Sequence, residues 1–226
     1  MTAATLFIVT KSSHGDTDQT EHVERVIAFP PGGTLEVHNF SGAVLITGTT
    51  GKDVEIKAIR RGKRELLDHI TLDIRASASG VMIDANRCDP GWKHKNDNVV
   101  ETSFEIKVPA SAKLDVDVFS SDLDIKGISG AERLKTFSGN ISVDAACAGG
   151  NPQLTAETFS GSIRTRLAHS VKGEVNFSSF SGNFDSELPL TLRSADHGRT
   201  ALSTTESASG RTLTFKTFSG QVQVIK

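Results

Sequence analysis

A three-residue unit, Phe-Ser-Gly, recurs along this chain, and its spacing constrains the fold more than any other feature. Complete copies begin at Phe40, Phe137, Phe159, Phe180 and Phe218, and degenerate copies begin at Ala78, Phe119, Ile128 and Ala208. The copies at 119, 137, 159 and 180 are separated by 18, 22 and 21 residues. A repeat of about 20 residues is typical of one rung of a solenoid.

Hydrophobic periodicity around each copy indicates the local geometry. Apolar residues alternate with polar ones before a motif, as at Leu114 and Val116, and alternate again after it, as at Leu123 and Ile125. Alternation of this kind predicts half-buried strands on both sides of each motif.

The two alternating series are out of register by one residue across each motif. The motif Phe therefore has the parity of the strand that follows, and the residue before it has the parity of the strand that precedes. We expect both residues to point inward at a corner, where Ser-Gly supplies the turn. Stacked corners would then align Phe137, Phe159 and Phe180 as an inward aromatic ladder.

The repeats predict an all-β protein, specifically a parallel β-helix or β-solenoid with rungs of about 20 residues. Residues 1–20 are expected to form a flexible N-terminal lead. Residues 21–226 are expected to form a single β-solenoid domain, which is less regular over 21–105 and regularly repeated over 106–226.

Three other segments interrupt or precede the repeats. Only residues 61–70 have helical spacing, and they predict no more than a short turn of helix. Residues 86–98 are polar and contain Pro90-Gly91, which predicts a long loop. The apolar run 3–9 has two interpretations, a short N-terminal strand or the remainder of an export signal. No apolar run approaches the roughly 20 residues of a transmembrane helix.

Charge and cysteine content limit the classes of partner and site. The formal net charge is −2, which does not favour nucleic acid as a partner. Cys88 and Cys147 are the only cysteines and neither has a CxxC partner, so a zinc site of the usual spacing is excluded. A disulfide between them stays open, although two free, buried thiols are favoured.

Several blocks of the sequence resemble the bacterial putative-adhesin family of β-strand-repeat proteins, which is a family of unknown function. The blocks are PGGTLEV at 31–37 with Phe40-Ser41-Gly42, FEIKVP at 104–109, and the serial repeats that end with GRTLTFKTFSG at 210–220. The resemblance covers about residues 21–226. It implies a fold similar to parallel β-helix proteins and an exported or cell-envelope location, since many members carry an export signal. No signal peptide is evident in this sequence.

Four aspartates alternate with apolar residues around one motif, namely Asp115, Asp117, Asp122 and Asp124. We expect all four to face outward near one corner. Clustered carboxylates can bind calcium or act as acid and base. No Gly-anchored calcium loop accompanies them, so a solvated face that discourages wrong strand pairing is favoured.

The remaining residues with chemical potential are scattered. Histidine occurs at His14, His22, His38, His69, His94, His169 and His197. None belongs to an HxH or HExxH motif, so no metal site is predicted. The segment Trp92-Lys93-His94-Lys95 could stack on a sugar, although packing of Trp92 against the rungs is favoured. The basic run 60–64 could contact phosphate, although a solvated turn is favoured because acidic residues follow it.

The glycosylation acceptor pattern occurs at Asn39, Asn140 and Asn176. All three asparagines overlap or flank a repeat motif. The pattern is therefore interpreted as a by-product of serine near the corners.

No nucleophile, base and orienting group occur in a recognisable arrangement, so no catalytic, cofactor-binding or metal-binding residue is predicted, and no cofactor. The favoured function is a non-catalytic surface or envelope protein, acting in adhesion or in sensing of the envelope. Its expected partner is an envelope polysaccharide or protein. Two alternatives stay open, a scaffold that self-associates end to end and a polysaccharide-active β-helix enzyme.

The sequence stops directly after a full repeat, which bears on self-association. We expect the strand at 221–226 to form an uncovered edge, whereas residues 1–33 are available to cap the other end. An uncovered edge is a template for another chain, and a two-fold contact closes on itself, so a C-terminal homodimer is predicted. Lys216 and Lys226 would instead protect the edge and keep the protein monomeric.

Overall fold

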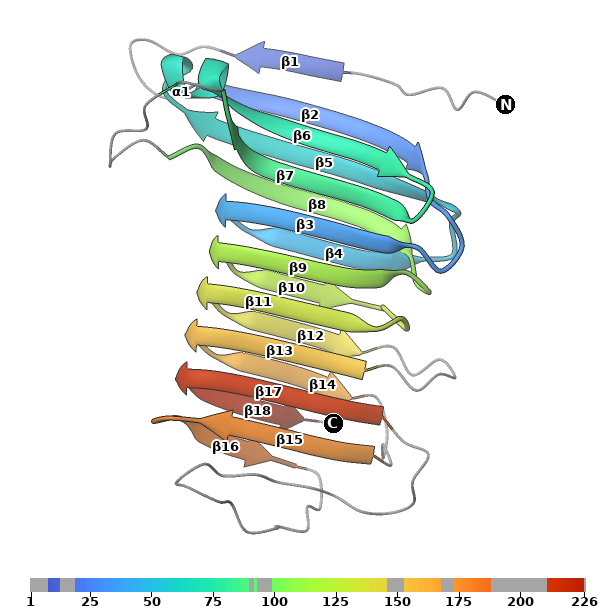
Figure 1. Cartoon of the computed structure of the whole chain (residues 1–226), viewed down its shortest axis with the longest axis vertical. Coiled ribbons are helices and arrows are strands. Elements are labelled where there is room, and N and C mark those ends of the chain that lie inside the picture. The colour runs from blue at the N-terminus through green and yellow to red at the C-terminus, as the bar shows by residue number, and fades with distance from the viewer. Residues whose placement is uncertain are drawn as a thin grey trace.

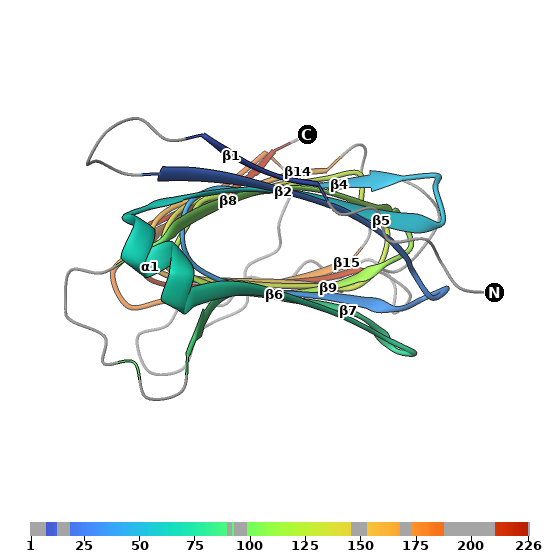
Figure 2. The ribbon, with the colours of Figure 1, turned by 90° about the horizontal axis from the view of Figure 1, so that it is seen from above.

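Two β-sheets face each other across a shared core and make up nearly all of the structure (Figures 1 and 2). The structure is a computed structural model that describes residues 8–12, 19–89, 92, 99–145, 153–167, 173–187 and 211–225. One helix occurs in these ranges, α1 (Arg64–His69). The predictions of an all-β protein and of no more than a short helix near 61–70 are confirmed.

The strand order of the two sheets defines the architecture. The first sheet has ten strands in the order β1 (Ile8–Ser12), β2 (Gln19–Ala28), β5 (Asp53–Gly62), β8 (Glu101–Pro109), β4 (Val44–Thr49), β10 (Leu123–Lys126), β12 (Ile141–Ala145), β14 (Ile163–Leu167), β18 (Gln221–Ile225) and β16 (Asn183–Ser186). The second sheet has eight strands in the order β15 (Gly173–Ser179), β17 (Arg211–Ser219), β13 (Gln153–Ser160), β11 (Glu132–Ser138), β9 (Lys113–Ser120), β3 (Thr34–Ser41), β7 (Gly80–Cys88) and β6 (Ile70–Ser77).

Each complete Phe-Ser-Gly motif, and the Phe119 copy, joins one strand of the second sheet to one strand of the first. Such a pair is called a two-strand unit here, and the six units are β3–β4, β9–β10, β11–β12, β13–β14, β15–β16 and β17–β18. Neighbouring units pair in parallel, with Leu123 opposite both Val44 and Ile141. The parallel, in-register pairing predicted between repeats is therefore present in these units.

The spatial order of the units differs from their order along the chain. The last unit, β17–β18, lies between β13–β14 and β15–β16, because the chain returns one layer toward the centre after β16. Val222 consequently has Ile163 on one side and Phe184 on the other. The prediction that the C-terminal strand forms an uncovered edge is wrong, since β15–β16 forms that end of the sheets.

The N-terminal half departs from parallel pairing. Antiparallel pairs join β1 to β2, β2 to β5, β5 to β8 and β6 to β7. Residues 8–12 and 19–20 belong to β1 and β2, so the expected flexible lead does not extend over them. The degenerate copy Ala78-Ser79-Gly80 is the turn of the β6–β7 hairpin, and the copy at Ile128 lies between β10 and β11 at the edge opposite the Phe motifs.

Inward-facing side chains of the two sheets form one continuous core. In the second sheet, one inward row crosses the strands with Val37, Val116, Leu134, Ala156 and Phe215, all fully buried. In the first sheet, the matching row contains Ile46, Ile125 and Val143. Burial of each large aliphatic side chain contributes about 1.5–3 kcal/mol, so these rows are the main source of cohesion between units.

Candidate functional site

The Phe side chains of the six two-strand units form one unbroken stack along an edge of the second sheet. This Phe ladder consists, in spatial order, of Phe40, Phe119, Phe137, Phe159, Phe218 and Phe180. Neighbouring ring centroids lie 4.6 to 5.0 Å apart, and neighbouring ring planes differ by at most 9°. The expected aromatic alignment is present, but Phe218 separates Phe159 from Phe180.

The Phe ladder faces solvent, so the prediction that it points into the core is wrong. Five of its residues are 40% to 46% exposed, and Phe180 at the end is 79% exposed. The alternation of β11 runs unbroken through Lys135 outward, Thr136 inward and Phe137 outward. The change of parity between strands therefore occurs in the Ser-Gly turn and not at the Phe.

Close backbone contact at the turns explains the glycine of the motif. A Cβ atom on Gly139 would collide with the carbonyl oxygen of Ser121, and one on Gly161 would collide with that of Gly139. Glycine is therefore required where one turn lies directly on the next.

Buried polar side chains fix the same corners from inside. The Thr136 hydroxyl donates to the carbonyl oxygens of Phe119 and Ser121 at 3.4 and 3.3 Å. The Asn39 amide donates to the carbonyl oxygen of Thr102 at 2.8 Å. Asn39 is 3% exposed, so its acceptor pattern is a consequence of corner structure, as interpreted from the sequence.

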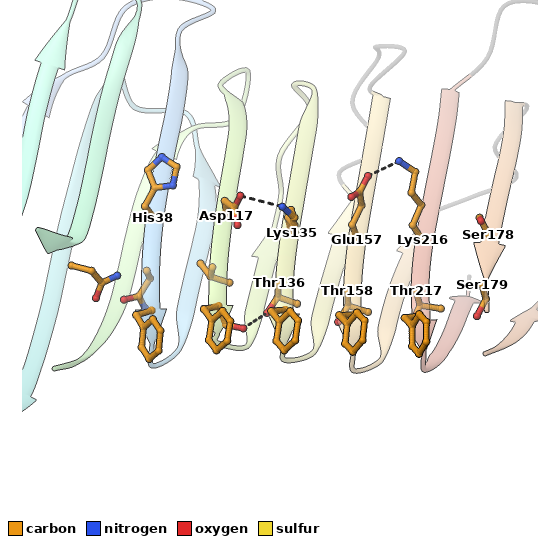
Figure 3. Close-up of a pocket in the computed structure, with 18 of the residues that line it drawn as sticks. His38, Asp117, Lys135, Thr136, Glu157, Thr158, Ser178, Ser179, Lys216 and Thr217 are labelled. Carbon is orange, nitrogen blue, oxygen red and sulfur yellow. Dashed lines mark hydrogen bonds and ion pairs between the residues drawn. The ribbon is translucent and has the colours of Figure 1, made fainter. Parts of the chain in front are cut away.

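A second row of outward side chains runs parallel to the Phe ladder, two residues before each Phe. This charged row consists of His38, Asp117, Lys135, Glu157, Lys216 and Ser178, in the order of their strands (Figure 3). Lys135 Nζ lies 3.6 Å from Asp117 Oδ2, and Lys216 Nζ lies 2.7 Å from Glu157 Oε1. Acid and base alternate along the row and are paired with each other.

A groove with a volume of about 1150 Å³ extends along the Phe ladder and the charged row. Thr136, Thr158 and Thr217, which lie on the strands between the two rows, also line it, although their side chains are buried (Figure 3). The groove crosses seven strands, from β7 to β15, so its length is about six inter-strand spacings, or roughly 29 Å. Its ion pairs join half-exposed side chains, and exposed pairs of this kind contribute only about 0–1 kcal/mol each. The lysines and carboxylates of these pairs can therefore bind a ligand in place of each other at little cost in free energy.

The members of the charged row could be identified in the sequence, because each lies two residues before a motif Phe. The residue two positions before each motif Phe is polar or charged in all six units. Without knowledge that the Phe side chains point outward, this regularity does not indicate a groove.

The four aspartates proposed from the sequence do not gather into one site. Asp115 and Asp117 lie on β9 in the second sheet, whereas Asp124 lies on β10 in the first sheet. Asp115 pairs with Arg133 at 3.0 Å and Asp124 with Lys126 at 2.7 Å. Asp122 accepts from the backbone and side-chain nitrogens of Asn140. They face outward as expected, but on different faces of the molecule.

The basic run 60–64 is divided between two elements, and its first member is buried. Arg60 is 4% exposed on β5, and its Nη1 lies 2.7 Å from Glu21 Oε2. Burial lowers the pKa of the Arg60 guanidinium, and the Glu21 charge opposes that effect. The expected solvated turn is therefore wrong for Arg60. Its inward parity with Ile56 and Ala58 was the signal in the sequence.

Trp92 packs against a small apolar cluster near α1 that is separate from the core between the sheets, whereas packing against the rungs was expected from the sequence. The cluster consists of Leu66, Leu67, Ile70 and Val100. Trp92 also stacks on His69 with 5.3 Å between ring centroids, and His69 Nδ1 lies 3.1 Å from Asp89 Oδ2. Lys93, His94 and Lys95 lie outside the described residues.

The other histidines and the cysteines contribute no cluster. His38 pairs with Glu36 at 2.8 Å, His22 is exposed, and Cys88 is an exposed free thiol, so the expectation that it is buried is wrong. Asn140 is exposed and Asn176 is half-buried. The residues outside the described ranges are Cys147, His14, His169 and His197. Within those ranges, no three His, Cys, Asp or Glu side chains could hold a metal ion. No helix described there is long and apolar enough to cross a membrane.

Comparison with solved structures identifies a protein of similar fold. A putative cell adhesion protein from Clostridium sporogenes has a similar structure, with a TM-score of 0.66 at 12% identity, over 89% of this chain and 97% of the other. A putative adhesin from Bacteroides fragilis aligns with a TM-score of 0.37 at 11% identity, over 90% of this chain and 97% of the other. No curated protein matches the sequence.

A sequence model of one protein family matches most of this chain. The model described as Toastrack DUF4097 matches residues 33–225, which is most of the chain and includes all six two-strand units. The resemblance to a bacterial putative-adhesin domain of unknown function is confirmed by this match. The chain therefore belongs to the Toastrack DUF4097 family.

Proposed function

We propose that this chain is a non-catalytic β-solenoid module, with rungs of about 20 residues over residues 21–226, that binds a partner at the bacterial cell surface or envelope. The module acts in adhesion or in sensing of the envelope. The observation that supports this function is the groove along the Phe ladder.

An exposed aromatic stripe of this size favours a binding role. A buried aromatic side chain covers about 150–250 Å², so six partly exposed Phe side chains present roughly 500–600 Å² of ring surface. The largest apolar patch on a typical monomer is about 300–600 Å² and is often functional. The name of the Clostridium sporogenes neighbour, a putative cell adhesion protein, agrees with a role in contact with other molecules.

A binding experiment with envelope material tests this function. The purified protein is sedimented with peptidoglycan sacculi and, separately, with detergent-extracted envelope proteins coupled to beads. We compare Phe159→Ser in the Phe ladder with Val26→Ser on β2, because both wild-type residues are 44% exposed. Loss of binding in Phe159→Ser alone, with both variants folded by circular dichroism, supports the groove. Full binding by Phe159→Ser contradicts the proposed function.

The enzyme alternative has one specific geometry to consider. Asp117 and Glu157 line the groove two strands apart, about 9.6 Å, near the upper limit for an inverting glycosidase pair. Such a pair needs one protonated carboxyl group and one free carboxylate. Here each carboxylate is engaged by a lysine ammonium group. We therefore expect no degradation of neutral or uronate polysaccharides, and turnover that is lost in Glu157→Gln would restore the enzyme alternative.

The scaffold alternative predicts self-association through the end formed by β15–β16. Among the described strands, β15 and β16 end their sheets there, and such edges could add another chain. Sedimentation velocity over a range of concentrations distinguishes the two functions, since a binding module remains of constant size and a scaffold grows.

A further inference from the structure

The groove differs in its chemistry from the aromatic platforms that bind sugars. Sugars stack on the faces of aromatic rings, but each face within the Phe ladder is covered by a neighbouring ring at 4.6 to 5.0 Å. Between the two end rings, Phe40 and Phe180, the exposed part of the ladder consists of ring edges. A flat apolar stripe of edges suits aliphatic side chains better than sugar rings.

Charge excludes a second class of ligand. The two lysines of the charged row are matched by Asp117 and Glu157, and no uncompensated cation lines the groove within the described residues. Asp84 on β7 adds a further carboxylate at one end, where it accepts from the backbone N–H of Asn86. Acidic polysaccharides and other polyanions need an excess of positive charge to offset their own. A polyanionic ligand is therefore disfavoured, and a ligand without net negative charge is favoured.

The direction of the groove limits which backbone conformation a peptide ligand can adopt. The groove runs across the strands, and the strands that line its middle pair with neighbours on both sides. A ligand crossing them cannot extend the sheet and can bond only to side chains. An extended β-segment would leave its N–H groups without backbone acceptors, whereas proline residues have no N–H group to satisfy.

The repeat of the charged row matches the repeat of a polyproline II helix. Lys135 and Lys216 are two strands apart, about 9.6 Å. Three residues of a polyproline II helix rise about 9.3 Å, and every third side chain lies on the same face. Carbonyl oxygens three residues apart can therefore accept from the two lysines while every third side chain packs on the Phe ladder.

The size of the ladder also favours a peptide over a second folded protein. A standard protein interface buries about 800 Å² on each partner, which exceeds the roughly 500–600 Å² of exposed ring surface. A polyproline II segment needs less area, because it is already ordered before binding.

We propose that the groove binds a proline-rich segment of a partner protein in the polyproline II conformation, with an apolar side chain at every third position against the Phe ladder. Lys135 and Lys216 donate to its carbonyl oxygens. This inference rests on the proposed function of the groove as the binding surface and names its ligand class.

The test uses a capped nine-residue peptide, (Pro-Pro-Leu)₃, which spans about 28 Å as a polyproline II helix and so covers nearly all of the groove. Binding is measured by calorimetry and by amide chemical shifts of the full chain. We expect shifts confined to the strands that carry the charged row and a negative heat-capacity change on binding. A peptide of the same composition with its three leucines adjacent is expected to bind about tenfold more weakly, because two of its contacts with the Phe ladder are lost.

Variants of the charged row supply the matched controls. Lys135→Met and Lys216→Met keep the apolar stem but remove the donor, and each is expected to weaken binding about tenfold. Arg133→Met alters the same face of β11 outside the groove and should change nothing. Equal binding by all four proteins overturns the assignment.

Two other probes separate this inference from the proposed function. Binding of cellohexaose or an oligogalacturonate in the groove, without binding of the peptide, overturns the proline-rich ligand and retains the groove as a binding surface. Absence of peptide-induced shifts along the charged row also overturns the inference. The proposed function itself fails only in the envelope-binding experiment with Phe159→Ser.

Discussion

Phe137 and Phe159 stack with their ring centroids 4.8 Å apart and their planes 3° apart, although both side chains are nearly half exposed. The pair joins two units that are adjacent in space and contributes to stability through ring contact more than through burial. Its effect on folding is therefore expected to be smaller than that of a core phenylalanine.

The first prediction compares two phenylalanines in neighbouring units. Phe159→Ala is expected to lower the free energy of unfolding by about 1–2 kcal/mol, from lost stacking and partial burial. Phe215→Ala removes a fully buried ring and is expected to cost about 3–5 kcal/mol. Urea denaturation measures both. Equal losses at the two positions would mean that the Phe ladder is buried in solution.

The second prediction concerns the turn glycine. Gly161→Ala places a Cβ against the backbone carbonyl of Gly139, which cannot move without shifting a whole turn. We expect a decrease in the melting temperature well beyond that of Gly51→Ala, whose Cβ would meet only the Thr49 hydroxyl at 3.3 Å. Thermal denaturation followed by circular dichroism provides the comparison. A melting temperature unchanged in Gly161→Ala would contradict the close stacking of turns.

The alternation at Leu114 and Val116 predicted the strands because it reports directly which face of a strand is buried, and the repeat of about 20 residues predicted their parallel pairing. The orientation of the Phe ladder was not predictable, since parity is lost within a turn and Phe137 can belong to either strand. The position of β17–β18 was not predictable either. Any unit can pair with any other of the same pattern, so the order of stacking is decided by packing between units.

The candidate site could likewise be predicted only in part from the sequence. Each lysine and acid of the charged row is an ordinary surface residue on its own strand, and only the lateral register places Lys135 beside Asp117. The sequence supplies the residues of the groove at a fixed offset from Phe, but their assembly depends on the orientation of the ring.

The third prediction concerns the buried ion pair of Arg60 and Glu21. Glu21→Gln leaves the guanidinium buried without its counter-charge, and loss of one partner of a buried pair typically costs about 3–5 kcal/mol. The double variant Glu21→Gln with Arg60→Met removes both charges and should recover part of that loss. Denaturant unfolding of the two single variants and the double variant forms a double-mutant cycle. Additive losses would show that the two side chains do not interact in solution.

The fourth prediction concerns the C-terminal strand, β18. It pairs with β14 on one side and with β16 on the other, so its amides are bonded within the sheet although it ends the chain. We expect the amides of Val222 and Val224 to exchange with solvent as slowly as those of β14. The amides of β16 are expected to exchange faster, because β16 pairs with one neighbour among the described strands. Hydrogen exchange followed by nuclear magnetic resonance measures each amide.

The proline variant Val224→Pro should be strongly destabilising, by about 3 kcal/mol or more, since an interior strand cannot tolerate proline. Rapid exchange at Val222 and Val224, together with a mild effect of the proline, would instead place β18 at the edge of the sheet.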